Sequence, residues 1–165
     1  FVEGKINIPK KSVILTIDDG NYSVFELAFP LLKKYNQSAS IFGVTEWDPT
    51  IVLFNSDHTE VHSHTNNMHQ GGCSGGQGGL IKCIDFDKGV SDLKLSSERL
   101  NGSKYLAYPF GEYNDHSIAI LKAANYEMAF TTDYGKIKVG DDLFKLKRMY
   151  IYNNVTLDKF ISMIS

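Results

Sequence analysis

The sequence predicts an α/β fold in which helices cover a mostly parallel sheet. Two observations lead to this fold class: short apolar runs alternate with segments of helical pattern, and polar clusters directly follow several of the runs. The 165 residues are enough for one domain, and 42% hydrophobic with 22% charged residues is ordinary for a globular protein. Periodicity alone leaves a barrel, closed or incomplete, and an open doubly wound sheet as alternatives.

Six apolar or β-like runs predict the strands of the sheet. They cover residues 12–17, 39–44, 59–63, 105–108, 127–131 and 147–152. Neither an internal repeat nor an interdomain linker interrupts the pattern, so we expect residues 1–165 to form a single domain. No apolar run approaches the length of about 20 residues that a membrane-spanning helix needs.

Four predicted helices separate these strands, and each begins after a residue that can cap its first turn. They run from Ser23 to about Tyr35, from Asp85 or Asp87 to Leu100, from Asn114 through Ala124, and over residues 157–164 behind Thr156. Pro30 either kinks the first helix or marks its end, and Asn101 with Gly102 ends the second. The resulting order is β-α-β, β-α, β-α-β, β-α.

Six glycines between Gln70 and Lys82 indicate a loop, which we expect to form a mobile wall of a cleft. Cys73 and Cys83 both belong to this loop. Two cysteines so close together can form a local disulfide in an oxidising compartment, and they can equally remain free thiols.

Polar or conformationally constrained residues follow three of the predicted strands at the same end. The first strand ends in Asp-Asp-Gly at residues 18–20, the third in His-Ser-His-Thr at 62–65, and the fourth in Tyr-Pro-Phe-Gly at 108–111. Ligands of folds with parallel strands bind at the carboxyl ends of those strands. Three such clusters at one end therefore predict an active site there.

The pair Asp18 and Asp19 is the first candidate. Adjacent strand residues point to opposite faces, so both carboxylates can share a site only where the strand ends and Gly20 turns the chain. Two neighbouring carboxylates resist joint ionisation unless a cation lies near them, which favours one metal ligand and one general base. The alternative is an ordinary Asp-Asp-Gly turn that caps the next helix.

The histidines form the second candidate, because four of the five lie between residues 58 and 69. On a regular helix, residues five apart lie about 140° away from each other, so His69 must come from a loop or distorted turn to meet His64. Two imidazoles and one carboxylate commonly bind zinc or a similar ion and leave a position for water. The alternative is a surface run of histidines. His62, on the same strand face as His64, either supports the ligands or is simply packed.

Together these motifs resemble the polysaccharide deacetylases of carbohydrate esterase family 4, the NodB-like domain. The family motif Thr-Phe-Asp-Asp-Gly reads Thr-Ile-Asp-Asp-Gly at residues 16–20, and the histidine motif reads Ser-His-Thr-Asn-Asn-Met-His at 63–69. A segment similar to Arg-x-Pro-Tyr-Gly reads Ala-Tyr-Pro-Phe-Gly at 107–111. The histidine spacing of five resembles the branch that acts on poly-N-acetylglucosamine.

The resemblance implies a distorted or incomplete (β/α) barrel that carries a metal-dependent N-deacetylase site. It assigns one divalent ion to Asp19, His64 and His69. It assigns the general base to Asp18 and an oxyanion-binding backbone N–H to Phe110. Zinc is the expected ion, with cobalt, nickel, manganese and iron as alternatives.

Two departures from the family pattern bear on the mechanism. Ala107 stands where many relatives carry an arginine that tethers the catalytic aspartate. Arg148, one of only two arginines, is therefore our candidate to reach Asp18, and an ordinary arginine at the barrel rim is the alternative. The late histidine motif of many relatives is missing, since no histidine follows His116. The general acid is then His116, His62, a water on the metal or Asp18 itself.

Aromatic residues near the inferred cleft are candidates for sugar contact, because flat rings suit the apolar face of a sugar. Tyr22 and Trp47 are the strongest of these candidates. Pro109 and Tyr113 lie in or beside the predicted oxyanion turn and are further candidates. Ordinary packing is the alternative, and it is our interpretation of Tyr108.

The sequence therefore predicts removal of N-acetyl groups from a glycan such as peptidoglycan, poly-N-acetylglucosamine or a chitin-like chain. An O-acetyl esterase of xylan-like substrates and a non-catalytic glycan-binding domain are the alternatives. A net charge of −2 gives no reason to expect nucleic acid as a partner. From the resemblance we expect an extracellular or cell-surface protein and a monomer. Because the chain opens on Phe1, we expect a domain excised from a longer protein.

Overall fold

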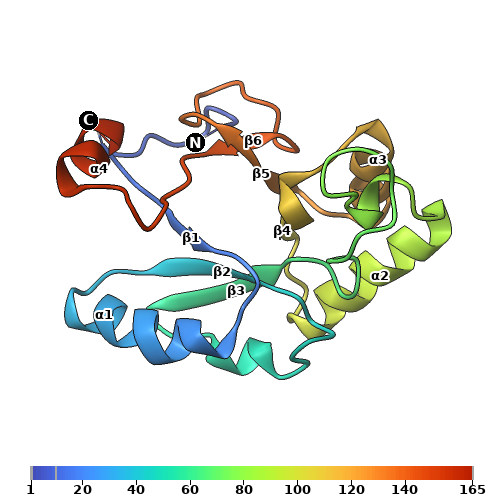
Figure 1. Cartoon of the computed structure of the whole chain (residues 1–165), viewed down its shortest axis with the longest axis horizontal. Coiled ribbons are helices and arrows are strands. Elements are labelled where there is room, and N and C mark those ends of the chain that lie inside the picture. Colours follow the sequence, from blue (N-terminus) through green and yellow to red (C-terminus); the bar gives the residue numbers. More distant parts are fainter. Residues whose placement is uncertain (1, 10, 165) are drawn as a thin grey trace.

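The computed structural model describes residues 2–9 and 11–164, which form a six-stranded sheet (Figure 1). The strands are β1 (Leu15–Ile17), β2 (Ala39–Gly43), β3 (Thr59–Ser63), β4 (Tyr105–Ala107), β5 (Met128–Tyr134) and β6 (Leu146–Arg148). All neighbours pair in parallel, and the strand order follows the sequence from β1 to β6. A doubly wound sheet reverses its order part-way, so that alternative is wrong.

The sheet curls into an incomplete barrel. In Figure 1, β1, β2 and β3 form the lower layer, β4 turns upward beside them, and β5 and β6 lie above. Within the described residues, β1 and β6 remain the two edges of the sheet. The predicted incomplete (β/α) barrel is therefore confirmed, and its open side lies between the two edge strands.

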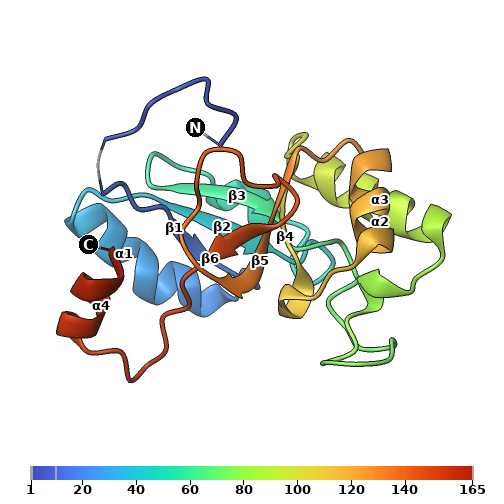
Figure 2. The same ribbon diagram turned by 90° about the horizontal axis from the view of Figure 1, so that it is seen from above.

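Four α-helices accompany the sheet in the described chain (Figure 2). They are α1 (Phe29–Lys34), α2 (Phe86–Arg99), α3 (Asp115–Ala123) and α4 (Leu157–Ile164). The helix expected over residues 23–35 begins as a π-helical segment, Val24–Ala28, and becomes α-helical one residue before Pro30. Proline has no N–H to donate, so the hydrogen-bond pattern changes there. The predicted caps Asp85 and Asn114 both accept a backbone N–H in the first turn of their helices. No described helix is long and apolar enough to cross a membrane.

Only the strand predicted over residues 59–63 keeps its limits in the structure. The strands β2 and β4 each end one residue early, and β5 covers Met128–Tyr134 in place of 127–131. The first and last strands also differ. The run 12–17 enters the sheet only at Leu15, because the neighbouring strand β2 begins opposite that residue. The strand predicted over residues 147–152 has both limits wrong, since β6 covers Leu146–Arg148. Its only neighbour in the described sheet, β5, ends at Tyr134 opposite Arg148, which leaves the later residues no strand to pair with.

Buried side chains on both faces of the sheet hold these elements together. Leu93 of α2 and Ile120 of α3 are fully buried against Leu106 of β4. The opposite, inner face carries a second cluster: Phe42, Ala107, Phe130 and Leu146. Each buried leucine of this kind contributes about 1.5–3 kcal/mol. Neighbouring strand residues alternate between the two faces, which is why Leu106 and Ala107 belong to different clusters.

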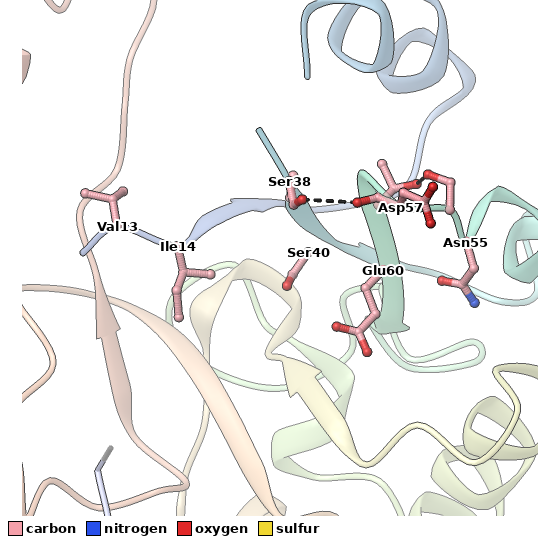
Figure 3. Close-up of a pocket in the computed structure, with 10 residues that line it drawn as sticks. Val13, Ile14, Ser38, Ser40, Asn55, Asp57 and Glu60 are labelled. Carbon is pink, nitrogen blue, oxygen red and sulfur yellow. Dashed lines mark hydrogen bonds between the residues drawn. The ribbon is translucent and has the colours of Figure 1, made fainter. Parts of the chain in front are cut away.

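A hollow of about 620 Å³ lies at the amino ends of β1, β2 and β3 (Figure 3). Ile14 precedes β1, Ser40 and Glu60 are the second residues of β2 and β3, and all three line the hollow. The hollow is at the opposite end of these strands from the polar clusters. It is therefore separate from the predicted site.

Candidate active site

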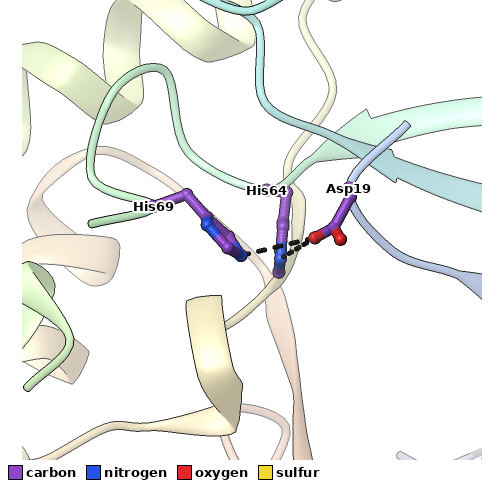
Figure 4. Close-up of side chains that lie close together, drawn as sticks. All are labelled: Asp19, His64 and His69. Carbon is purple, nitrogen blue, oxygen red and sulfur yellow. Dashed lines mark ion pairs between the residues drawn. The ribbon is translucent and has the colours of Figure 1, made fainter. Parts of the chain in front are cut away.

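Asp19, His64 and His69 come together at the carboxyl ends of β1 and β3 (Figure 4). Asp19 follows β1, His64 follows β3, and His69 comes from the loop beyond it. The Nε2 atoms of His64 and His69 lie 3.4 and 3.3 Å from Asp19 Oδ1. One ligand atom from each residue lies within 4.8 Å of the others. Across residues 2–9 and 11–164, this is the one group of histidine, cysteine and acidic residues placed to hold a metal ion.

The ring of His64 is oriented by the backbone of β4. The side chain is almost fully buried, and its Nδ1 donates to the Ala107 carbonyl at 2.7 Å. A carbonyl oxygen only accepts hydrogen bonds, so Nδ1 carries a proton and Nε2 is the atom left to face Asp19. This partner fixes the ring as an outer hydrogen bond fixes a histidine that binds a metal.

The ionisation of Asp19 suits a cation site. Hydrogen bonds from His64 and His69 hold the pKa of its carboxyl well below the usual range, although partial burial opposes them. A divalent ion held by these three residues would take the place of the protons shared between the rings and the carboxylate. Two imidazole nitrogens and one carboxylate oxygen, with a further position open, are a donor set that zinc and similar ions accept.

Left-handed backbone conformations turn the chain at each of the three loops of the site. The φ angles of Asp19, Thr65 and Phe110 are 72°, 71° and 59°. Thr65 is β-branched, and holding such a residue there costs about 1–3 kcal/mol. Its Oγ1 accepts the N–H of Met68 at 3.0 Å, and Met68 is buried in the core. This turn redirects the chain directly after the first histidine and lets a spacing of five bring the second one back.

Two charged residues of α2 hold the histidine loop in place. The Asp92 carboxylate accepts the N–H groups of Asn66 and Asn67, both at 2.9 Å, and burial raises its pKa. Arg99 donates to Asn66 Oδ1 at 2.6 Å and to the Thr45 carbonyl at 3.1 Å. Sequence reasoning missed both roles. The available signal is their separation of seven residues, which places both on one helix face.

Arg148 reaches Asp18 across the open side of the barrel. Its Nη1 and Nη2 donate to Asp18 Oδ1 and Oδ2, each at 2.7 Å. Its Nε donates to the Thr131 carbonyl at 2.8 Å, and Nη1 also approaches Thr16 Oγ1 at 3.3 Å. A bidentate pair of this kind fixes the plane of the carboxylate. It also joins the two edge strands of the sheet.

The turn η4 (Pro109–Gly111) lies beside His69. Gly111 has φ 71°, and a Cβ there would lie 2.0 Å from a neighbouring threonine, so only glycine fits. The two hydrogen bonds of the turn are donated by Gly111 and Glu112, and neither uses the Phe110 N–H. The Phe110 ring lies 4.5 Å from the His69 ring, centroid to centroid.

The aromatic candidates have different surroundings. Trp47 packs edge-on against His69 at 5.0 Å between centroids and is 53% exposed, while Tyr22 is 68% exposed. Tyr113 stacks on Tyr108 at 5.2 Å and donates from its hydroxyl to an aspartate of β5. Tyr108 is completely buried, which confirms its interpretation as a packing residue. Trp47 is thus the aromatic candidate that directly contacts the cluster.

Comparison with known proteins shows what the segment that carries this site is similar to. The sequence profile described as polysaccharide deacetylase matches residues 5–78, which contain both the aspartate pair and the histidine pair. The poly-β-1,6-N-acetyl-D-glucosamine N-deacetylase of Staphylococcus epidermidis is 28% identical over 171 residues, covering 91% of this chain. The matched segment is just under half of the chain, and over it the chain is similar to the polysaccharide deacetylase family. The chain spans 58% of the length of the S. epidermidis relative.

Two solved structures show the same fold as this chain. IcaB from Ammonifex degensii superposes with a TM-score of 0.83 at 22% identity, covering 99% of this chain and 77% of that one. The Streptococcus pyogenes deacetylase PplD, solved in complex with acetate, has a TM-score of 0.79 at 24% identity and covers 99% and 75%. These likenesses support the fold described above.

Two other histidines of this chain have structural partners. His62 is 5% exposed, shares a hydrogen bond of 2.9 Å with Ser103 Oγ and packs against Tyr105. Burial lowers its pKa. His116 donates to the Ile84 carbonyl at 2.8 Å. Packing therefore accounts for both residues.

The glycine-rich loop is closed on itself. Cys73 and Cys83 form a disulfide, which the sequence left open. Gly71 and Gly79 pair as an isolated antiparallel bridge, and the loop begins directly after the metal-ligand candidate His69. The covalent link therefore shapes a segment attached to the site.

We expect removal of this disulfide to destabilise the protein. A double Cys73→Ser and Cys83→Ser variant should lose about 2–3 kcal/mol of unfolding free energy, because a short closed loop restricts the unfolded chain. Thermal melts with and without a phosphine reductant test this. The reductant should lower the Tm of the wild type and leave that of the variant unchanged. An unchanged wild-type Tm after verified reduction would contradict the expectation.

The Glu112 carboxylate predicts a pH dependence of stability. Lys82 Nζ lies 2.8 Å from it, and this partner, with two backbone N–H groups, lowers the pKa of Glu112 from 4.5 to about 2. An acid whose pKa is lower in the folded than in the unfolded chain stabilises above the unfolded value and loses that contribution as the pH falls. Urea titrations between pH 4.5 and pH 2 should therefore show a steeper loss of stability in wild type than in Glu112→Gln. Parallel curves would show that Glu112 contributes nothing to this dependence.

Proposed function

We propose that this domain is a metal-dependent hydrolase that removes N-acetyl groups from an N-acetylglucosamine polysaccharide. The observation that carries the proposal is the cluster of Asp19, His64 and His69, with a second carboxylate, Asp18, next in the chain and held by Arg148. The cluster supplies ligands, and Asp18 supplies a base that is not one of them. Metal-dependent amide hydrolysis uses both.

Asp19, His64 and His69 are the proposed ligands of one divalent ion, and zinc is our choice from their chemistry. Cobalt, nickel, manganese and iron accept similar ligands, so metal analysis must decide between them. When bound, such an ion polarises a carbonyl and lowers the pKa of a water molecule toward about 7.

The remaining steps belong to residues of this chain. Asp18 takes a proton from the attacking water while the water oxygen bonds to the acetamide carbon. The Phe110 N–H donates to the oxygen that becomes negatively charged, and Pro109 helps to hold that turn. The carbon–nitrogen bond then breaks to give acetate and a free amine. Since His62 and His116 are packed elsewhere, we propose that Asp18 returns its proton to the leaving amine.

The substrate proposal rests on the names of the relatives and on the aromatic residues near the site. The curated relative is named for poly-β-1,6-N-acetyl-D-glucosamine, and we propose a glycan of this class for the present chain. Trp47, beside His69, is placed to stack on a sugar ring, with Tyr22, Pro109 and Tyr113 as further contacts. A disulfide and a polymeric substrate both support an extracellular or cell-surface location.

A substrate panel tests the proposal. Protein stripped by a chelator and reloaded with single metals is given β-1,6-linked N-acetylglucosamine oligomers, chitin oligomers and O-acetylated xylan, and released acetate is measured. We expect the metal-reloaded protein to release acetate from the N-acetylglucosamine oligomers. The stripped protein should release none. Acetate from xylan alone would indicate an O-acetyl esterase. Oligomer binding without acetate would indicate a glycan-binding domain.

A further inference from the structure

Glu112 joins two loops of the site. It follows the Phe110 turn directly, and its side chain reaches the glycine-rich loop. Oε1 accepts the N–H of Gln77, and Oε2 accepts the N–H of Gly79 at 2.8 Å. Lys82 Nζ lies 2.8 Å from Oε2, and the Glu112 side chain is only 16% exposed. A mostly buried carboxylate with three donors is therefore the centre of this junction.

The glycine-rich loop is shaped around this carboxylate. A Cβ at Gly76 would lie 1.9 Å from Glu112 Oε1, and one at Gly79 would lie 3.2 Å from Oε2. Gly76 also has φ 59°, a conformation that side chains disfavour. The glycines thus let the backbone approach Glu112 closely enough for its N–H groups to donate.

The same loop is attached to His69. Leu80 donates from its N–H to the carbonyl of Gln70, the residue after His69, at 2.9 Å. The disulfide between Cys73 and Cys83 closes the same loop covalently. A displacement of the loop around Glu112 therefore transmits to the backbone beside His69.

We propose that Glu112 is a positioning residue that holds the Phe110 turn against the loop of His69. The His69 and Phe110 rings lie 4.5 Å apart, so the two loops meet beside the site. This role rests on the proposed function, in which the ion held by His69 and the Phe110 N–H would act on the same carbonyl. Glu112 then sets the separation of His69 and Phe110. Glu112 itself touches no reacting atom.

The test uses Glu112→Gln in the full chain, with Glu127→Gln as its matched control. Glu127 also pairs with a lysine, Lys104, at 3.0 Å, but at the amino ends of β4 and β5. Glutamine is close in size to glutamate, yet its amide group presents donors to an N–H and to Lys82. Metal-free, ¹⁵N-labelled proteins are compared by NMR. We expect the Phe110 amide and the His69 ring resonances to shift in Glu112→Gln and to keep their wild-type positions in Glu127→Gln.

Activity is the second readout. In the metal-loaded protein, Glu112→Gln should lower kcat by about 10- to 100-fold with little change in KM, because small displacements of reacting groups have large effects. Glu127→Gln should match the wild type. Unshifted Phe110 and His69 resonances in a folded Glu112→Gln variant would overturn the proposal. An inactive wild type would instead remove the proposed function, while the NMR comparison still decides the role of Glu112.

Discussion

Replacing Asp18 with asparagine is expected to lower kcat for acetate release by about 10²- to 10⁴-fold, the usual contribution of a general base. Asparagine keeps the size of the side chain but cannot take a proton from water. Because Asp18 is not among the proposed ligands, the variant should still bind one metal ion. Steady-state acetate release and metal content measured on the same sample check both parts.

Asp57→Asn is the matched control for this prediction. Asp57 precedes β3 and lines the hollow at the amino ends of the strands, at the far end from the site. This control should retain wild-type kcat. If Asp18→Asn kept activity within a few-fold of the wild type, Asp18 would not be the base.

Replacing His69 with alanine is expected to weaken metal binding by more than about 100-fold. Loss of a partner that only supports a ligand already costs about 10- to 100-fold, and loss of a ligand should cost more. His69 is preferable to His64 for this test, because His64 is buried and bonded to the Ala107 carbonyl. Isothermal titration of the metal-free protein with zinc measures the change.

His58→Ala is the control for metal binding, since His58 shares its hydrogen bond with the Gln37 carbonyl away from the cluster. Its zinc affinity should equal that of the wild type. Equal zinc affinities for His69→Ala and His58→Ala would show that the metal, if bound, lies elsewhere.

The sequence predicted the convergence of the site because the relevant signals are local. Asp19 ends an apolar run and precedes a glycine, and His64 ends another run. Parallel strands bring such ends to one edge whatever the details of packing. Arg148 as the partner of Asp18 was suggested by the scarcity of arginine and by the alanine at position 107, and the structure shows the contact.

The remaining features depend on contacts between distant segments. Asp92 lies 26 residues from Asn66, and no periodicity marks its carboxylate as buried against a loop. Glu112 meets Gly79 only after the glycine-rich loop has folded back. The end of β6 depends on where β5 stops pairing, which the composition of residues 147–152 does not encode.

The most direct test of the proposed chemistry combines metal content with turnover. Zinc-reloaded wild-type protein and Asp18→Asn, each assayed for bound zinc, are incubated with a β-1,6-linked N-acetylglucosamine oligomer, and acetate is followed over time. We predict one zinc ion per chain in both proteins and acetate release only by the wild type. Zinc bound by both with no acetate from either, or equal acetate from both, would contradict a deacetylase in which Asp18 acts as the base.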